Sequence, residues 1–396
     1  MEAVLNHPAL KIDKSVWKLV KFGDVVAEPK ETCKSIIAEG IEHVVGLEHI
    51  ETGDLHLRKS ATIEESTTFS KKFRKGDVLF GRRRAYLKKA AKAEFDGICS
   101  GDITVFRAKK DLLPELLPFI VSNDKFFDYA VKHSAGGLSP RVKFKDLANY
   151  EFLLPPKAEQ ARLAELLWAM DEVIEKEKEV LGRLEINRKS FENKSLYKFK
   201  TATESQLPPN YKIMKLEEIA EISGGSTPSR TNEDFWGGEI PWLTPTDVTN
   251  HNKIHLDKTK EYITALGLKD ISNRIYPSGS ILYCSRATIG YAIINEVPMT
   301  TNQGFSNFIV NEKVSTYFLY FLLKHLTPEL TRLAGGSTFL EISKSAIRNF
   351  KVIIPPKKEM NEIENAILEF EKNRLVLESK ISSSQALQKS LINQIF

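Results

Sequence analysis

The segment FLLPPK at residues 152–157 recurs as VIIPPK at residues 352–357, about 200 residues further along the chain. A second anchor recurs in the same order, because GDVLF at residues 76–80 returns as GSILY at residues 279–283. A period this long is far above the ~20–50 residues of solenoid repeats, so each copy is expected to be a domain with a connecting element. At 396 residues the chain is also too long for one ordinary core, which agrees with two copies.

A long helix is predicted after each Pro-Pro pair, since proline cannot donate to a preceding strand and suits the first turn of a helix. Apolar residues spaced three and four apart predict a coiled-coil seam on both helices. The seam residues are Leu163, Leu166, Met170, Val173, Val180 and Leu184 in the first helix, and Ile363, Ile367, Phe370, Leu377, Ile381 and Leu391 in the second. The polar breaks are Glu177, Asn187, Arg374, Ser384 and Gln388. The two seams are expected to pair with each other, and the alternative is that each stripe docks on its own globular domain.

The parts before each Pro-Pro pair are predicted to be mixed, with short β-branched strands bounded by Gly or polar turns and a few short helices. The predicted fold class is therefore α+β, with two globular domains and two long spacer helices. The expected boundaries are an N-terminal tail at 1–15, a first domain at 16–154, the first spacer helix and linker at 155–203, a second domain at 204–354 and the second spacer helix at 355–396.

Composition and charge restrict the class of protein. Residues 1–200 hold 36 Lys and Arg against 31 Asp and Glu, so the whole net charge of +5 falls in the first half. The three cysteines are far apart and form no Cys-x-x-Cys pair, which argues against a zinc knuckle or a disulfide framework. The first residues do not resemble a secretory leader, and we expect a cytoplasmic protein with no membrane partner.

A basic segment between residues 71 and 92 is opposed, within the segment, only by Asp77. Such a cluster suits a polyanion, although a solvated basic surface is the alternative. In the first copy the candidate DNA contacts are Lys71, Lys72, Arg82, Arg83, Arg84 and Lys88. In the second copy they are Ser226, Thr227, Ser229, Arg230, Arg286, Thr288, Asn302 and Gln303. Guanidinium and amide groups fit base edges and phosphates, while ordinary turn roles remain open for the loop residues.

Catalytic motifs are missing from the sequence. There is no Asn/Asp-Pro-Pro-Tyr/Phe motif for a flipped base and no Gly-x-x-x-x-Gly-Lys-Ser/Thr loop for a nucleotide. His251 and His255 are four apart, as a helical metal pair would be, but the polar residues around them favour a loop, so no metal site is predicted.

The chain resembles the specificity subunits of type I restriction-modification enzymes over nearly its full length. The matching motifs are GGSTPSR at 224–230, WGGEIPW at 236–242, SRATIG at 285–290 and NQGF at 302–305. The first copy also carries the family's Glu-Gln pair after Pro-Pro, whereas Met360 replaces that Gln in the second copy, and residues 24–70 lack a Gly-Gly-x-Thr-Pro opening.

The resemblance implies two target recognition domains separated by two antiparallel spacer helices, which recognise a bipartite, asymmetric site in double-stranded DNA. It also implies two methyltransferase subunits and restriction (translocase and nuclease) subunits as partners in phage defence. S-adenosylmethionine, ATP and Mg²⁺ are then expected on those partners, and no cofactor or catalysis on this chain. Two rival functions remain: a coiled-coil scaffold, and the recognition region of a fused restriction-methylation enzyme.

Overall fold

The computed structural model describes residues 12–396 except 63–67, 198, 200–206 and 337–339. Most of the predicted N-terminal tail and the end of the predicted linker therefore lie outside the described residues. The chain divides into two compact units. Unit 1 is Met1–Glu179 with Leu377–Phe396, and unit 2 is Val180–Val376. No helix among the described residues is long and apolar enough to span a membrane.

Unit 1 contains a five-stranded sheet of order β2-β9-β6-β7-β4. Its strands are β2 (Val26–Ala27), β9 (Ile103–Ala108), β6 (Val78–Gly81), β7 (Ala90–Ala93) and β4 (His56–Leu57), and only β4 runs parallel to its neighbour. A smaller sheet has the order β3-β8-β5, with β3 (Val44–Val45), β8 (Gly97–Cys99) and β5 (Lys71–Phe73). The first and last strands, β1 (Lys18–Lys21) and β10 (Glu151–Leu154), pair antiparallel and close the globular part.

Short helices complete unit 1. They are α1 (Phe22–Val25), α2 (Leu117–Ser122), α3 (Asp124–Lys132) and α4 (Phe144–Leu147). Phenylalanine rings from strands and helices meet in the core, where Phe106 of β9 contacts Phe22 and Phe80 at centroid distances of 5.2 and 5.4 Å.

Unit 2 repeats the five-stranded sheet with the order β12-β19-β16-β17-β14. These strands are β12 (Ala220–Gly224), β19 (Phe305–Val310), β16 (Ile281–Cys284), β17 (Ala292–Asn295) and β14 (His255–Leu256). Again only the last strand is parallel to its neighbour, and β11 (Lys212–Lys215) pairs with β20 (Lys351–Ile354) as β1 pairs with β10. The sequence repeat is thus a structural repeat.

The short α-helices described in unit 2 are α7 (Leu216–Ile219), α8 (Pro245–Thr249), α9 (Ala265–Asp270), α10 (Thr316–His325), α11 (Thr327–Thr331) and α12 (Lys344–Asn349). The smaller sheet differs between the units. In unit 2 its middle strand is β13 (Trp236–Leu243), flanked by β15 (Glu261–Ile263) and β18 (Thr300–Thr301). The middle strand of unit 1 is instead β8, which comes late in its copy. The two copies therefore share one sheet and vary the other.

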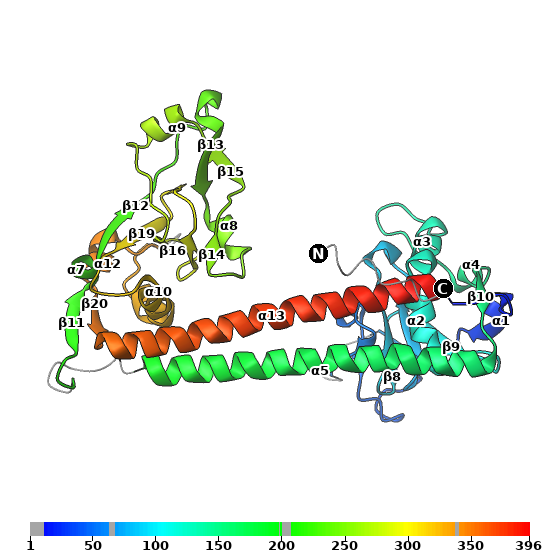
Figure 1. Ribbon diagram of the computed structural model, residues 1–396. Helices are drawn as coiled ribbons and strands as arrows, with labels where there is room; N and C mark the ends of the chain where they lie inside the picture. The colour runs from blue at the N-terminus through cyan, green and yellow to red at the C-terminus, as the bar shows by residue number, and fades with distance from the viewer. Residues whose placement is uncertain (1–11, 63–67, 198, 200–206, 337–339) are drawn as a thin grey trace. The chain divides into compact units, whose positions relative to one another are not determined.

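Both long helices form, as α5 (Lys157–Leu196) and α13 (Lys357–Ile395), and each contributes one half to each unit (Figure 1). In unit 1, Gln388 donates to the carbonyl of Leu167 at 3.3 Å. In unit 2, the rings of Phe191 and Phe370 are 5.9 Å apart. Rising residue numbers on α5 meet falling numbers on α13, so the helices pair antiparallel within both units.

The helix seam also joins the globular cores. In unit 1, Leu163 and Leu167 of α5 and Ile395 of α13 belong to the same apolar cluster as the sheet residues. In unit 2, Ile363 and Ile367 of α13 do the same. The two alternatives for the stripes are thus both realised, since each helix packs on a domain and on the other helix.

The predicted seam of the first helix is wrong at three positions. Leu166, Val173 and Val180 are 40%, 50% and 52% exposed, whereas the neighbouring Leu167 and Ile174 are buried. At the first two of these positions the next residue along the chain is buried instead. The other predicted residues of α5, Leu163, Met170 and Leu184, are buried or half-buried.

The physical reason is that polar side chains occupy part of this seam. Asp171 and Glu177 are both buried. Glu177 is an expected polar break of the seam, whereas the apolar periodicity gives no sign that Asp171 is buried. Lys380 places its Nζ 3.2 Å from Oε1 of Glu177, as an ion pair without hydrogen-bond geometry.

The predicted seam residues of the second helix lie on its buried side. The residues Ile363, Ile367, Phe370, Leu377, Ile381 and Leu391 are all buried or half-buried. The expected polar breaks Arg374 and Gln388 lie in the seam and are themselves buried.

A matched pair of adjacent leucines tests the corrected seam. Leu167→Ala should lower the free energy of unfolding by about 2–5 kcal/mol, because it leaves a cavity in a closed core. Leu166→Ala should cost clearly less, about 1 kcal/mol, because that side chain is already 40% exposed. Urea unfolding of both variants measures the difference, and equal losses would contradict the assignment.

Candidate nucleic-acid interface

The loop after β6 carries the three consecutive arginines of the first copy, at the end of a strand as predicted. Arg83 forms a backbone bridge with Arg141, and the amide of Arg84 donates to the carbonyl of Pro140 at 2.8 Å. Arg84 has the left-handed backbone conformation, with φ 53° and ψ 56°, and its side chain is exposed. The loop is therefore held through its backbone, which leaves the Arg84 guanidinium directed to solvent.

Most of the other predicted cations of unit 1 are paired with carboxylates that are distant in sequence. The ion pairs are Lys71 with Glu28 at 3.5 Å, Lys72 with Glu39 at 2.6 Å, Arg83 with Asp102 at 3.2 Å and Lys88 with Asp124 at 2.5 Å. These four cationic side chains are only 23–38% exposed. The hydrogen bond from Lys72, with two backbone amides, lowers the pKa of Glu39 to about 2.

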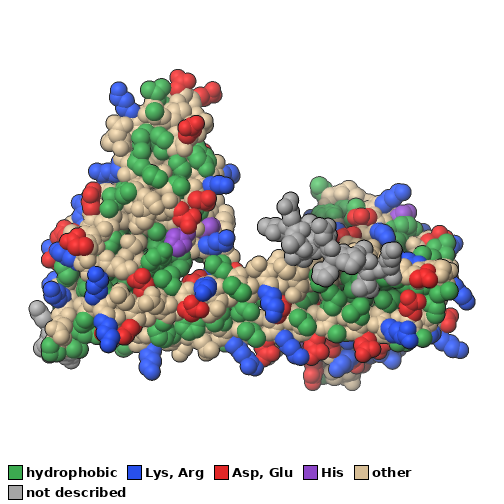
Figure 2. Space-filling model, in the orientation of Figure 1, with side chains coloured by type: hydrophobic (Ala, Val, Ile, Leu, Met, Phe, Trp, Pro, Cys, Tyr) green, Lys and Arg blue, Asp and Glu red, His purple; other side chains and the backbone are tan. Residues whose placement is uncertain are grey.

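The expectation that Asp77 is the one carboxylate opposing this basic segment is therefore wrong, because in the fold carboxylates from other segments pair with its cations. Asp77 itself is buried and accepts two hydrogen bonds from Arg107 at 2.7 Å. The space-filling view agrees with this, because acidic and basic side chains alternate over the visible face of each unit (Figure 2).

A more basic surface lies in a hollow that the sequence pattern indicated only in part. This basic hollow is lined by Glu28, Lys30, Arg82, Lys143, Phe144 and Lys145. Its three lysines are exposed, and Nε of Arg82 is buried without a hydrogen-bond partner among the described residues. Four cations thus face one carboxylate, which already pairs with Lys71. The spacing K-F-K at 143–145 was a local signal, but only the fold brings it beside Arg82.

Unit 2 places two of its predicted residues, Arg286 and Thr288, after the equivalent strand β16. Arg286 follows β16 and forms a backbone bridge with Glu341, as Arg83 does with Arg141. Its Nε is 3.6 Å from Oε2 of Glu341. Ala287 has a φ of 58° and takes the place of Arg84, so the same backbone carries different side chains in the two units.

The Gly-flanked loop after β12 is fixed by hydrogen bonds. Thr227 donates to Oε1 of Gln303 at 2.6 Å, so the structure brings these two predicted residues together. The carbonyl of Ser226 accepts from the indole of Trp242 at 3.0 Å. Gly225 is required here, because a Cβ would lie 2.0 Å from the carbonyl oxygen of Thr301.

The side chain of Arg230 is held by contacts with other residues of unit 2. It donates to both carboxylate oxygens of Glu261, at 2.5 and 3.0 Å, and lies 3.8 Å from the ring centroid of Trp236. Ser229 uses its amide on Asp270 at 3.1 Å. Glu261 and Asp270 were missed in the sequence because they come from β15 and α9.

The side-chain polar atoms of Asn302 and Thr288 are less accessible to a ligand than the exposed guanidinium of Arg84. Oδ1 of Asn302 accepts from the amide of Gly304 at 2.9 Å, which is the turn role that the sequence left open for it. The Thr288 hydroxyl is buried.

The pair His251 and His255, which is four residues apart in the sequence, is engaged in hydrogen bonds. Nε2 of His251 lies 2.6 Å from the carbonyl of His255, and Nε2 of His255 lies 2.9 Å from the hydroxyl of Tyr317. Groups of three or more His, Cys, Asp or Glu suited to a metal are not found in the described parts of the chain.

The salt dependence of duplex DNA binding tests the basic hollow. A plot of log binding constant against log salt concentration has a negative slope. Each cation that no longer binds a phosphate should reduce the magnitude of this slope by ~0.9. The triple change Arg82→Ala, Lys143→Ala and Lys145→Ala should flatten that slope. The control Lys72→Ala with Lys88→Ala should leave it nearly unchanged, because both lysines already pair with carboxylates outside the hollow. A larger effect of the control would contradict the assignment.

Comparison with known proteins places the chain among proteins of one kind. Residues 14–185 and 208–384 both match the family model of the type I restriction modification DNA specificity domain. The specificity subunit of the type I restriction enzyme MjaIX, from Methanocaldococcus jannaschii, is 37% identical over 193 residues, which are 48% of this chain and 44% of that protein. The match thus spans less than half of this relative.

Two solved structures share the fold. A chain from a study of complex assembly and conformational transition of the type I R-M system has a TM-score of 0.61 at 22% identity, and the match covers 96% of both chains. The type I restriction-modification S subunit from M. genitalium has a TM-score of 0.56 at 14% identity, with the same coverage. Because both family matches coincide with the structural repeat, the chain belongs to the type I restriction modification DNA specificity domain family and carries two copies of that domain.

Proposed function

We propose that this chain is the DNA-reading specificity subunit of a type I restriction-modification complex. The observation that carries the proposal is the repeat: two units with the same five-stranded sheet share one antiparallel pair of helices. Two similar domains on one chain can read two half-sites, and the helices between them set the gap. The recognised site is therefore bipartite.

Differences between the units support an asymmetric site. The smaller sheet has a different strand order in each copy, and Arg84 of unit 1 corresponds to Ala287 of unit 2. The basic hollow belongs to unit 1. Because direct readout depends on individual side chains in the grooves, two domains that differ at these positions read different bases.

Catalysis is assigned to partner subunits. The sequence contains neither a flipped-base motif nor a nucleotide loop, so this chain acts without a cofactor of its own. Two methyltransferase subunits would bring S-adenosylmethionine, and restriction subunits would bring ATP and Mg²⁺. Leu166, Val173 and Val180 leave apolar groups exposed along α5, which is a surface suited to helical partners.

Two rival functions give different outcomes. A coiled-coil scaffold would show no preference among DNA sequences. A region of a fused restriction-methylation enzyme would transfer methyl groups when joined to catalytic motifs of its own chain.

Mapping methylated adenines in cells that express the whole complex tests the proposal. We expect one bipartite site, and the pure chain with S-adenosylmethionine, ATP and DNA should yield no methylated or cut product. Exchanging residues 204–354 for those of a relative should change one half-site only. Methylation by the verified pure chain, or sites without two halves, would contradict the proposal.

The helix pair should act as a ruler for the gap between half-sites. Four residues inserted beside Glu177 in α5, with four beside Lys380 in α13, lengthen the pair by about 6 Å, close to two base-pair steps of ~3.4 Å. Four residues turn a helix by ~400°, so the seam is displaced by only about 40°. Methylated sites should keep both half-sites with a longer gap. An active variant with altered half-sites and an unaltered gap would refute the ruler.

A further inference from the structure

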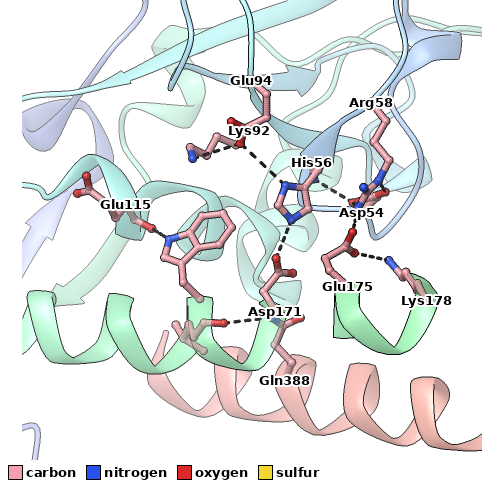
Figure 3. Close-up of polar contacts among 12 residues, drawn as sticks. Asp54, His56, Arg58, Lys92, Glu94, Glu115, Asp171, Glu175, Lys178 and Gln388 are labelled. Carbon is pink, nitrogen blue, oxygen red and sulfur yellow. Dashed lines mark hydrogen bonds and ion pairs between the residues drawn. The ribbon is translucent and has the colours of Figure 1, made fainter. Parts of the chain in front are cut away.

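A polar cluster attaches the globular part of unit 1 to α5 (Figure 3). Nε2 of His56, on β4, lies 2.6 Å from Oδ2 of Asp171 on α5. One helical turn further on, Arg58 donates to Glu175 at 2.7 Å and to Asp54 at 2.6 Å. Two successive turns of the spacer helix are therefore held by one short segment of the first domain.

The carboxylate of Asp171 depends on this contact. Asp171 is only 6% exposed and lies in the helix seam, where an unpaired charge is strongly destabilising. The ring of Trp168, on the preceding turn of α5, contacts the His56 ring at a centroid distance of 5.7 Å. The imidazole thus fits between an apolar ring and a buried carboxylate.

Unit 2 uses a different attachment at the equivalent place. His255 occupies the same position on β14 as His56 on β4, but it bonds the hydroxyl of Tyr317. The spacer helix is instead held by Arg374, which donates to the carbonyl of Asn252 at 2.8 Å. A guanidinium stays charged at all physiological pH values, whereas an imidazole does not.

The charged groups around His56 favour its protonated form. Asp171 and Glu175 face it from α5, and Glu94, after β7, lies 3.9 Å from Nδ1. Lys92 pairs with Glu94 at 3.3 Å, and the ring of Trp168 also receives this ammonium at 4.9 Å.

The pKa of His56 is raised from its ordinary value of 6.5, chiefly by the hydrogen bond to Asp171, while burial and Arg58 oppose the shift. The pair therefore stabilises the fold fully below about 6.5 and loses its contribution as the pH rises through the raised value.

We propose that His56 is a positioning residue, whose charged pair with Asp171 holds the first recognition domain in one orientation on α5. Accurate reading of the first half-site requires this pair, whereas the second half-site does not depend on it. The inference rests on the proposed function for its consequence at DNA, but the attachment itself is a property of the free chain.

Measurements on the free full-length chain test the attachment. The His56 ring signal, assigned by its loss in His56→Gln, should titrate above the ordinary value and shift down in Asp171→Asn. The amide of Lys92, bonded to the carbonyl of Leu55 at 2.7 Å, should lose hydrogen-exchange protection several-fold as the pH rises, after correction for intrinsic exchange. The control His255→Asn should leave both results unchanged. An ordinary or lowered His56 pKa would overturn the attachment even if Asp171→Asn fails to fold.

Selection of bound duplexes from a random library, at pH 6.5 and 8.5, tests the consequence. We expect sequence preference to weaken at one half-site as the pH rises, and Asp171→Asn to show that weakened preference at both pH values. Equal changes at both half-sites, or none, would overturn the positioning role. If no sequence is enriched at all, the proposed function fails, while the titration and exchange results still decide whether the attachment exists.

Discussion

The antiparallel pairing of α5 with α13 is the constraint on which the rest of the structure depends. Each helix is about 40 residues long, and a helix of that length is stable in water only when one face is buried. The buried face has two partners, the opposite helix and the core of a globular part. Ile395 and Phe396, at the end of α13, lie in the apolar cluster of unit 1. The first globular core is thus completed by residues from the far end of the sequence.

A polar residue helps to fix which face of α5 is buried in unit 1. A purely apolar stripe would tolerate a shift by one residue, and α5 does carry a second apolar stripe at Leu166, Val173 and Val180. Asp171 selects the observed face of α5, because its buried carboxylate bonds His56 of β4 when that face packs on the first domain. Burying a charge is costly, so such a pair contributes more to specificity of packing than to net stability.

The distribution of charge follows the same logic. The basic segment at residues 71–92 looks like a single polyanion site in the sequence, but the fold brings Glu28, Glu39, Asp102 and Asp124 against it. The cations that keep basic surroundings, Arg82 and the lysines near it, come from segments more than 50 residues apart. Which part of the surface keeps a basic character is therefore decided by tertiary neighbours and not by charge density along the chain.

Local pattern alone was enough to identify the repeat, the two long helices and the strand ends that carry Arg83 and Arg286. These features depend on interactions between residues close in sequence, such as Pro-Pro at a helix start and the alternation of short strands. The tertiary structure decided three other features: which face of α5 is buried, which cations pair with carboxylates, and that the Arg230 side chain pairs with Glu261. Each depends on a partner from a distant segment, and His56 is 115 residues from Asp171. Side chains that far apart meet only after the chain has folded, so their pairing leaves no periodic signal in the sequence.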